Sequence, residues 1–225
     1  MAPAPDAWLA QLRRRLPRHA LIKATGTMTF MVLFFWGYFA VMRYPLVPAV
    51  VMPLTAVDAW IGPSPAAFPI YASLWVYVSI PPALFSRFAT LALFGFWIAL
   101  LCLACLAIFW LWPTLVPAFA MDWSGYPGMA LIKGVDAGGN ACPSLHVASA
   151  AFAAAWLDRL LRGVGAPSAI RGLNVLHFIA ITWSTMATRQ HVFLDVAAGL
   201  AIGLAFAAAS LRHARRHKDV QPASA

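Results

Sequence analysis

The feature that most constrains this fold is a set of long apolar stretches without charge. Residues 24–42 run uncharged from Lys23 to Arg43, and a membrane-spanning helix needs about 20 mostly apolar residues. Only 10% of the residues are charged, whereas a soluble domain carries about 25%. Most of the chain must therefore face lipid, and we predict an all-α, polytopic membrane protein.

Six stretches are apolar enough to predict membrane-spanning helices packed in one bundle. They cover residues 24–42, 67–86, 88–112, 143–162, 171–188 and 190–211. The second is interrupted by Pro69, Pro81 and Pro82, and the fifth is short. Arginines precede the first stretch as in a signal peptide, but no small-residue cleavage site ends it, so we expect it to be retained.

The chain divides into a membrane domain between two basic ends. Residues 1–23 form a predicted cytoplasmic, basic, amphipathic segment, residues 24–211 the six-helix domain, and residues 212–225 a basic cytoplasmic tail. In the first segment, apolar residues share one helical face and arginines take the other. That pattern fits a helix lying on the membrane surface, or a solvated basic tail.

The basic residues predict the orientation in the membrane. An even number of spans puts both termini on one side, which then holds 13 of the 16 Lys and Arg residues. The other side holds Arg43, Lys133 and Arg189. Since basic residues concentrate on the cytoplasmic side, we expect both termini to be cytoplasmic, in the inner membrane of a bacterial-type cell.

Two polar motifs interrupt the apolar pattern at the opposite, extracytoplasmic side. The stretch NACPSLHVASA holds Ser144 and His146, and TRQHVFLDVAAG holds His191 and Asp195. Each motif stands where an even-numbered span begins, so both are predicted to meet at one membrane face. Ionisable residues at a membrane boundary point to function.

These four side chains suit nucleophilic and acid–base chemistry. His191 and Asp195 are four residues apart, which on a helix stacks them on one face. A carboxylate that holds one imidazole nitrogen leaves the other free as nucleophile or base, although the pair can also serve only to close the helix entrance. His146 can protonate a leaving oxygen. Ser144 suits a helix N-cap, a phosphate ligand, or both.

Phosphoryl transfer also requires positive charge around the phosphate oxygens. The available cations on this side are Lys133, Arg189 and Arg43. Two histidines and one aspartate can alternatively bind zinc or manganese. No third histidine or cysteine pair completes such a site, so we favour metal-free chemistry without a cofactor.

Other polar residues are expected to be structural. Cys102 and Cys105 lie in a fully apolar run, where core packing is the expectation. His177 lies well inside the fifth stretch, as a hydrogen-bonded packing residue. Asp58, flanked by turn residues, is expected to cap or orient the first loop.

The two motifs together resemble those of the type 2 phosphatidic acid phosphatase superfamily. That family's P-S-G-H motif is matched by Pro143 to His146, with Leu145 in place of glycine. Its S-R-x5-H-x3-D motif is matched from Ser184 to Asp195, with Thr185 in place of arginine. The resemblance covers roughly residues 40–210, and a K-x6-R-P motif is missing.

The substitutions at Leu145 and Thr185 make the chain similar to the branch of this superfamily that contains inositol-phosphoceramide synthases. The P-S-L-H form and the S-T variant look like that branch. So does the stretch from 53 to 77, an aspartate-containing loop followed by an aromatic helix.

The resemblance implies a six-helix membrane enzyme that works without metal. His191 would be the nucleophile that forms a phosphohistidine, Asp195 its orienting partner, and His146 the acid. Phosphate would be bound by a set of residues from both motifs and the nearby cations, with Arg189 or Lys133 supplying the charge missing at Thr185. That set is Ser144, Ser184, Thr185, Lys133, Arg189 and Arg43.

The expected activity is the cleavage of a lipid phosphomonoester or pyrophosphate at the extracytoplasmic face. Water as acceptor gives a phosphatase, and a lipid hydroxyl gives a phosphotransferase. A proton-coupled transporter is the alternative from another class. The expected partners are a lipid phosphate substrate and membrane lipids, and no nucleic acid, because the basic residues cluster between apolar stretches.

Overall fold

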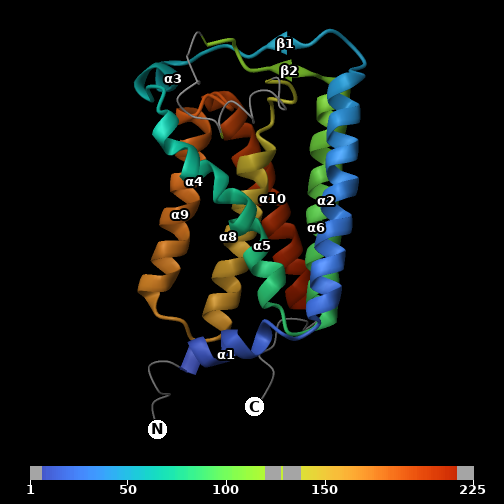
Figure 1. The fold of residues 1–225 in the computed structure, drawn as a ribbon, viewed down its shortest axis with the longest axis vertical. Coiled ribbons are helices and arrows are strands. Elements are labelled where there is room, and N and C mark those ends of the chain that lie inside the picture. Colours follow the sequence, from blue (N-terminus) through green and yellow to red (C-terminus); the bar gives the residue numbers. More distant parts are fainter. Residues whose placement is uncertain (1–6, 120–127, 129–137, 217–225) are drawn as a thin grey trace.

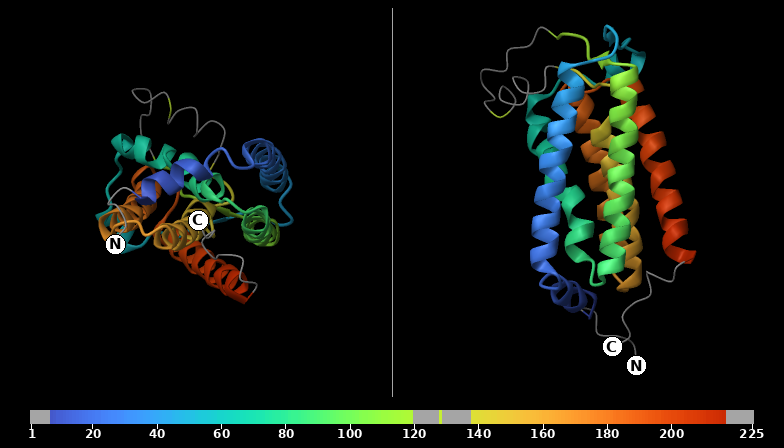
Figure 2. Two further views of the ribbon diagram at one scale, coloured as in Figure 1. Left: turned by 90° about the horizontal axis from the view of Figure 1, so that it is seen from below. Right: turned by 90° about the vertical axis from the view of Figure 1, so that its right-hand side faces the viewer.

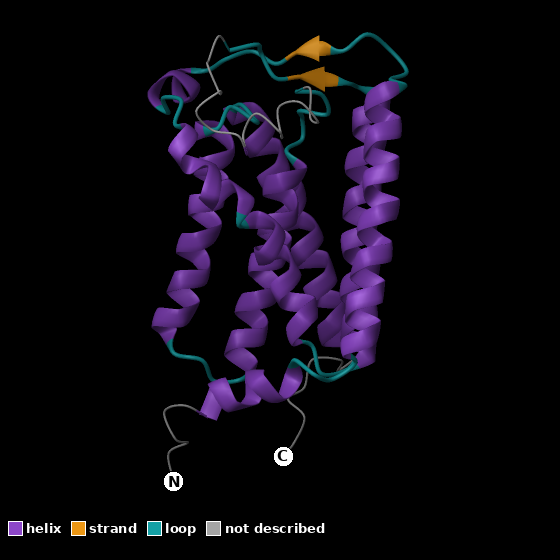
Figure 3. Ribbon diagram, viewed as in Figure 1, coloured by secondary structure: helices purple, strands orange, loops and turns teal. Residues whose placement is uncertain are grey.

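A computed structural model describes residues 7–119, 128 and 138–216 of the chain. Its long helices are α2 (Ala20–Arg43), α6 (Phe88–Leu111), α8 (Leu145–Gly163), α9 (Ser168–Ala187) and α10 (Phe193–Arg216) (Figure 1). The shorter helical elements are α1 (Ala7–Arg15), α3 (Ala56–Trp60), η1 (Pro65–Ala67), α4 (Phe68–Ala72) and α5 (Leu74–Leu84). Two short strands, β1 (Val50–Val51) and β2 (Thr114–Leu115), pair in parallel (Figure 3).

The all-α prediction is confirmed, apart from this two-residue strand pair. A helix or a broken helix lies at each of the six predicted spans. Within the described residues, four helical stretches are long and apolar enough to cross a membrane: Ala20–Arg43, Pro65–Leu84, Phe88–Leu111 and Phe193–Arg215. The protein is thus a multi-pass membrane protein. Helices α8 and α9 carry more polar residues, and the count of six spans stays a prediction.

Several element boundaries differ from those predicted. Helix α2 begins at Ala20 rather than at residue 24. The second span breaks at Ser73, whose hydroxyl donates to the carbonyl of Ile70 at 2.6 Å, whereas Pro81 and Pro82 lie inside α5. Helix α10 begins at Phe193, so His191 precedes the helix.

Helix α8 is the centre of the bundle. It packs against α5, α6, α9 and α10, and Figure 2 shows it enclosed by them. Its contact with α10 is a backbone approach, because a Cβ at Gly199 would clash with the backbone at Ser144 and one at Gly203 with that at Ala148. Small residues at a helix interface allow such close packing in membranes.

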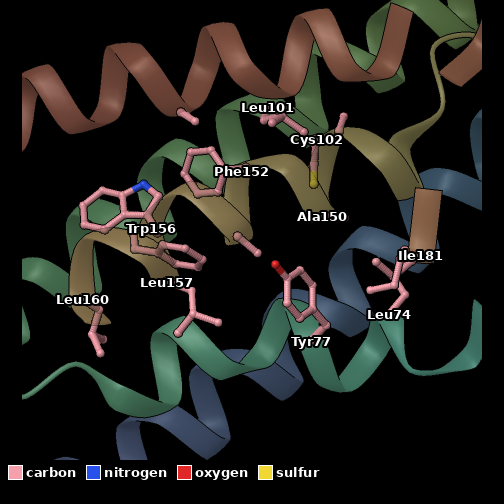
Figure 4. Packing of buried hydrophobic residues seen from close by; sticks show 14 of the residues in the cluster. Leu74, Tyr77, Leu101, Cys102, Ala150, Phe152, Trp156, Leu157, Leu160 and Ile181 are labelled. Atoms are coloured by element: carbon pink, nitrogen blue, oxygen red, sulfur yellow. The ribbon is translucent and has the colours of Figure 1, made fainter. Parts of the chain in front are cut away.

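Aromatic side chains fill the core around α8. The Phe94 ring centroid lies 5.2 Å from that of Phe152 and 5.8 Å from that of Trp156. The Trp156 indole N–H donates to the Ser210 hydroxyl at 2.9 Å, which gives this buried donor its partner. Cys102 is buried in the same core, as expected (Figure 4).

Several polar side chains inside the bundle form hydrogen bonds between helices. The Tyr77 hydroxyl donates to Asn174 Oδ1 at 2.7 Å, and the Asn174 amide donates to the carbonyl of Ala154 at 3.1 Å. His177 Nε2 lies 3.1 Å from the Ser73 hydroxyl. The expectation of a hydrogen-bonded packing role for His177 is confirmed, and these bonds join α5, α8 and α9.

The two ends of the bundle differ. The strands β1 and β2 lie at one end and α1 lies across the other (Figure 1). The last turns of α10 reach the same end as α1, so the described parts nearest the two termini lie together. Which end faces the cytoplasm stays a prediction, as do the domain boundaries.

We predict that Gly203→Ala destabilises the protein by about 1–3 kcal/mol, because the new methyl group overlaps the Ala148 backbone. The matched control is Gly172→Ala in α9, where an added Cβ meets no atom within 4 Å. This control should gain up to about 1 kcal/mol, because alanine favours the helix. Thermal unfolding in detergent measures both, and equal melting temperatures would contradict the close approach.

Candidate active site

The first polar motif is fixed at the N-terminus of α8. The Ser144 side chain accepts the backbone N–H of Val147 at 3.3 Å, so its predicted N-cap role is confirmed. The Ser144 backbone N–H donates to the Asp195 carbonyl at 2.8 Å. This bond ties the start of α8 to the first turn of α10 and places His146 in the first turn of α8.

The second motif is a tight turn between α9 and α10. The Thr185 carbonyl accepts the N–H groups of Gln190 and His191 at 3.0 and 3.1 Å. Arg189 has a φ of 55°, in the left-handed region that is uncommon for a residue other than glycine. The turn therefore places His191 just before the start of α10, and its backbone is strained at Arg189.

The pairing of His191 with Asp195 does not use the predicted helical stacking. His191 lies before α10, and only Asp195 is in its first turn. The Asp195 Oδ2 atom accepts the Val192 N–H at 3.0 Å and lies 3.5 Å from His191 Nδ1. The carboxylate thus sits at the helix N-terminus, where the helix dipole favours a negative charge.

The two motifs meet, as the sequence predicted. His146 Nδ1 lies 2.9 Å from His191 Nε2, and the other nitrogen of His146 lies 2.9 Å from the Tyr71 hydroxyl. Tyr71, His146, His191 and Asp195 therefore form a continuous chain of contacts. His191 is 5% exposed and Asp195 is fully buried, so the carboxylate has no accessible surface of its own.

Asp58 holds the turn from the other side, which confirms the expectation that it caps and orients the loop. Its carboxylate accepts the backbone N–H and the hydroxyl of Thr55 at 2.8 and 2.7 Å, and the Phe193 N–H at 2.7 Å. Its backbone carbonyl accepts an Arg189 guanidinium N–H at 3.1 Å. One residue of α3 therefore fixes both ends of the turn that carries His191.

Three more of the predicted phosphate ligands, Arg189, Ser184 and Thr185, lie at the turn before α10. Arg189 is buried, with its guanidinium carbon 4.6 Å from the centre of the Phe119 ring. Ser184 and Thr185 are fully buried, and their hydroxyls donate to the carbonyls of Ile181 and Thr182. The three side chains lie around the turn, and their binding of phosphate stays a prediction.

The other two predicted cations are Arg43 and Lys133. Arg43 is exposed at the end of α2 and is not among the described residues that line the cavity beside them. Lys133 lies outside the described residues. Over the residues that the structure describes, no three His, Cys, Asp or Glu side chains are grouped as metal ligands.

Two aromatic residues at the site escaped the sequence analysis. Tyr71 contacts His146, and the Trp75 ring centroid lies 6.2 Å from that of the same histidine. They are four residues apart, so α4 and α5 turn them toward one side despite the break at Ser73. Their helical spacing is visible in the sequence, but it is also that of ordinary core residues.

A cavity of about 570 Å³ opens beside the histidines. His146, His191, Tyr71 and Trp75 line it at this end, together with side chains of α2, α5, α6 and α8. Except near the histidines, its walls are mostly apolar. The site thus joins a pair of polar nitrogens to an apolar space within the bundle.

A family comparison matches residues 64–209 to the PAP2 superfamily. The matched segment covers more than half of the chain and contains the whole chain of contacts from Tyr71 to Asp195. The chain belongs to the PAP2 superfamily. Membership implies an enzyme with membrane phosphatase or phosphotransferase activity.

The match identifies the superfamily and gives no support to the inositol-phosphoceramide-synthase-like branch. Searches of curated proteins and of solved structures find no match to the chain.

The contacts of Asp58 predict a pH-dependent stability. Burial by itself would raise the pKa of its carboxyl group, but the hydrogen bonds from Thr55 and Phe193 and the charge of Arg189 hold this pKa below its ordinary value. A carboxyl group with a lowered folded-state pKa stabilises the fold above its unfolded pKa. That stabilisation is lost as the pH falls through the folded pKa.

We therefore expect Asp58→Asn to lower the melting temperature at neutral pH. The difference in melting temperature between the variant and the unmutated protein, the gap, should become smaller as the pH falls below about 4. Thermal unfolding in detergent between neutral and acidic pH measures this gap. A gap of constant size over the whole range would contradict a role for the Asp58 charge.

Proposed function

We propose that this member of the PAP2 superfamily is a metal-independent lipid phosphatase or phosphotransferase that works through a phosphohistidine at His191. It would act on a lipid phosphomonoester or pyrophosphate at the extracytoplasmic face of the inner membrane. The observation that carries the proposal is the chain of contacts Asp195–His191–His146–Tyr71 beside an apolar cavity. A lipid phosphate fits both parts of this site, because its headgroup can meet the histidines while its apolar tail lies in the cavity.

His191 is the proposed nucleophile because its two nitrogens face different partners. With the Nδ1–H directed to Asp195, the lone pair is left on Nε2, which faces His146. The carboxylate also stabilises the positive charge that develops on the ring during attack. Nε2 would then form the bond to phosphorus as the bond to the leaving oxygen breaks.

His146 is the proposed general acid. The Tyr71 hydroxyl can donate to His146 Nε2, which places the proton of this ring on Nδ1, the atom facing His191. That proton would pass to the departing oxygen. In-line transfer puts the phosphorus and this oxygen between the two nitrogens, so an entering phosphate must first separate the rings from their 2.9 Å contact.

The phosphate oxygens need donors around them. Ser144 accepts one backbone N–H as a cap and has a hydroxyl hydrogen left to give, so the cap and ligand roles are compatible. Arg189 is buried two residues from the nucleophile and held by Asp58. We propose it as the source of the charge missing at Thr185, with Ser184 and Lys133 as the further proposed ligands.

The acceptor decides between phosphatase and phosphotransferase. Water would release inorganic phosphate, and a lipid hydroxyl would form a new lipid, as in the inositol-phosphoceramide-synthase-like alternative that the P-S-L-H form suggests. Incubating the purified protein with phosphatidate, phosphatidylglycerophosphate, a prenyl pyrophosphate or a phosphoinositide, with and without a lipid alcohol, distinguishes these outcomes by product.

We predict that His191→Ala lowers phosphate release from the best of these lipids by at least about 10³-fold, because no nucleophile remains. The unmutated protein should carry label from a radioactive phosphate substrate in an acid-labile, alkali-stable form, and His191→Ala should not. His19→Ala, at an exposed histidine preceding α2, is the control and should keep full activity. Activity that is lost in EDTA and restored by zinc would contradict metal-independent chemistry.

We predict that His146→Ala acts through the leaving group. Hydrolysis of an alkyl phosphate should fall by about 10²-fold or more, because its alkoxide needs a proton. Hydrolysis of p-nitrophenyl phosphate should fall far less, because its leaving group is stable as an anion. Equal losses with both substrates would contradict the role of His146 as the acid.

A further inference from the structure

The cavity beside the histidines extends far beyond the reacting atoms. Its described lining includes His146 and His191 at one end and Ile22 and Lys23 at the other. Between these ends lie apolar side chains of α2, α5 and α6. Examples are Phe30, Phe34, Leu74, Val78, Leu91 and Ile98.

The depth of the cavity follows from the helix that forms one wall. Lys23 and Phe39 both line it and both lie on α2, which is a continuous helix. Phe39 lies 16 positions after Lys23 (39 − 23), which corresponds to about 24 Å along the helix at about 1.5 Å per residue. One leaflet supplies only about half of a hydrocarbon core that is about 30 Å thick. The cavity is therefore deeper than one leaflet.

Lys23 closes the deep end. Its ammonium group donates to the carbonyl of Arg15 at 2.9 Å and to that of Ala83 at 2.7 Å. These bonds fasten the start of α2 to the end of α1 and to the last turn of α5, and the side chain is buried. The deep end thus has a polar floor that is held in place from two sides.

Two glycines keep the deep half of the cavity wide. Gly26 in α2 and Gly95 in α6 both line it, and an added Cβ at either position meets no atom within 4 Å. Glycine is less stable than alanine inside a helix, and no close backbone packing requires glycine at these positions. Their effect on the structure is the space that they leave open.

A hydrocarbon chain is the occupant that fits this space. Water is disfavoured in an apolar cavity because it finds no hydrogen-bond partners. Since the bilayer is as apolar as the cavity wall, burial from water gives no advantage there. What a chain gains is dispersion contact with the wall along its whole length, and a chain that stops halfway leaves the deep half unfilled.

We propose that the substrate is a lipid phosphate whose hydrocarbon chain lies extended along the cavity from the histidine pair to Lys23, deeper than one leaflet is thick. This inference rests on the proposed function, because the phosphate is placed at His191. The deep half of the cavity, at a distance from the reacting atoms, then determines which chain length the enzyme prefers.

The test compares two single-chain substrates with the same headgroup. Decyl phosphate has half as many chain carbons as eicosyl phosphate, so its chain cannot enter the deep half of the cavity that the eicosyl chain can fill. Both are presented at the same mole fraction in maltoside micelles. The unmutated protein should favour eicosyl phosphate in kcat/KM by about tenfold. Gly26→Phe and Gly95→Phe should abolish this preference and leave the turnover of decyl phosphate unchanged, which also shows that the variants are folded.

The matched control is Gly172→Phe in α9, which has the same open space around its Cβ but does not line the cavity. It should keep the preference for the long chain. Equal kcat/KM for both chains in the unmutated protein, or an unchanged preference in both cavity variants, would overturn the inference and leave the proposed function standing. Transfer of phosphate from neither substrate, either to water or to an added lipid alcohol, would overturn both.

Discussion

The site depends on how closely α10 approaches α8. Gly199 and Gly203 bring the α10 backbone onto the carbonyls of Ser144 and Ala148, and the Ser144 N–H bonds directly to the Asp195 carbonyl. With the two helix starts fixed at this spacing, His146 Nδ1 and His191 Nε2 lie 2.9 Å apart. A Cβ at either glycine would overlap the α8 backbone, so the helices would have to move apart and the bond from Ser144 to Asp195 would lengthen.

Around this contact, backbone N–H groups donate to both buried aspartates. Asp195 accepts the N–H of Val192, and Asp58 accepts that of Phe193 from the opposite side. A carboxylate buried without such donors would be strongly destabilising. The two aspartates therefore fix the strained turn at Arg189, and the orientation of His191 follows from the turn.

Much of this was available from the sequence, and the errors have specific physical causes. The apolar stretches predicted the helices, because lipid-exposed backbone must satisfy its own hydrogen bonds. The same rule could not locate the break at Ser73, where a hydroxyl bonds to the carbonyl of Ile70. Nor could periodicity show that His191 precedes α10, because the turn is stabilised by Asp58, more than a hundred residues away in the chain.

By itself, the sequence determined the all-α membrane class, the end of the bundle that carries both motifs, and the pairing of His191 with Asp195. These follow from local composition and spacing, and the match of residues 64–209 supports the family. Tertiary structure alone decided that Tyr71 meets His146, that Asp58 holds Arg189, and that a cavity runs from the histidines to Lys23. Each of these depends on side chains from separate helices, whose distances are set by packing that no local pattern records.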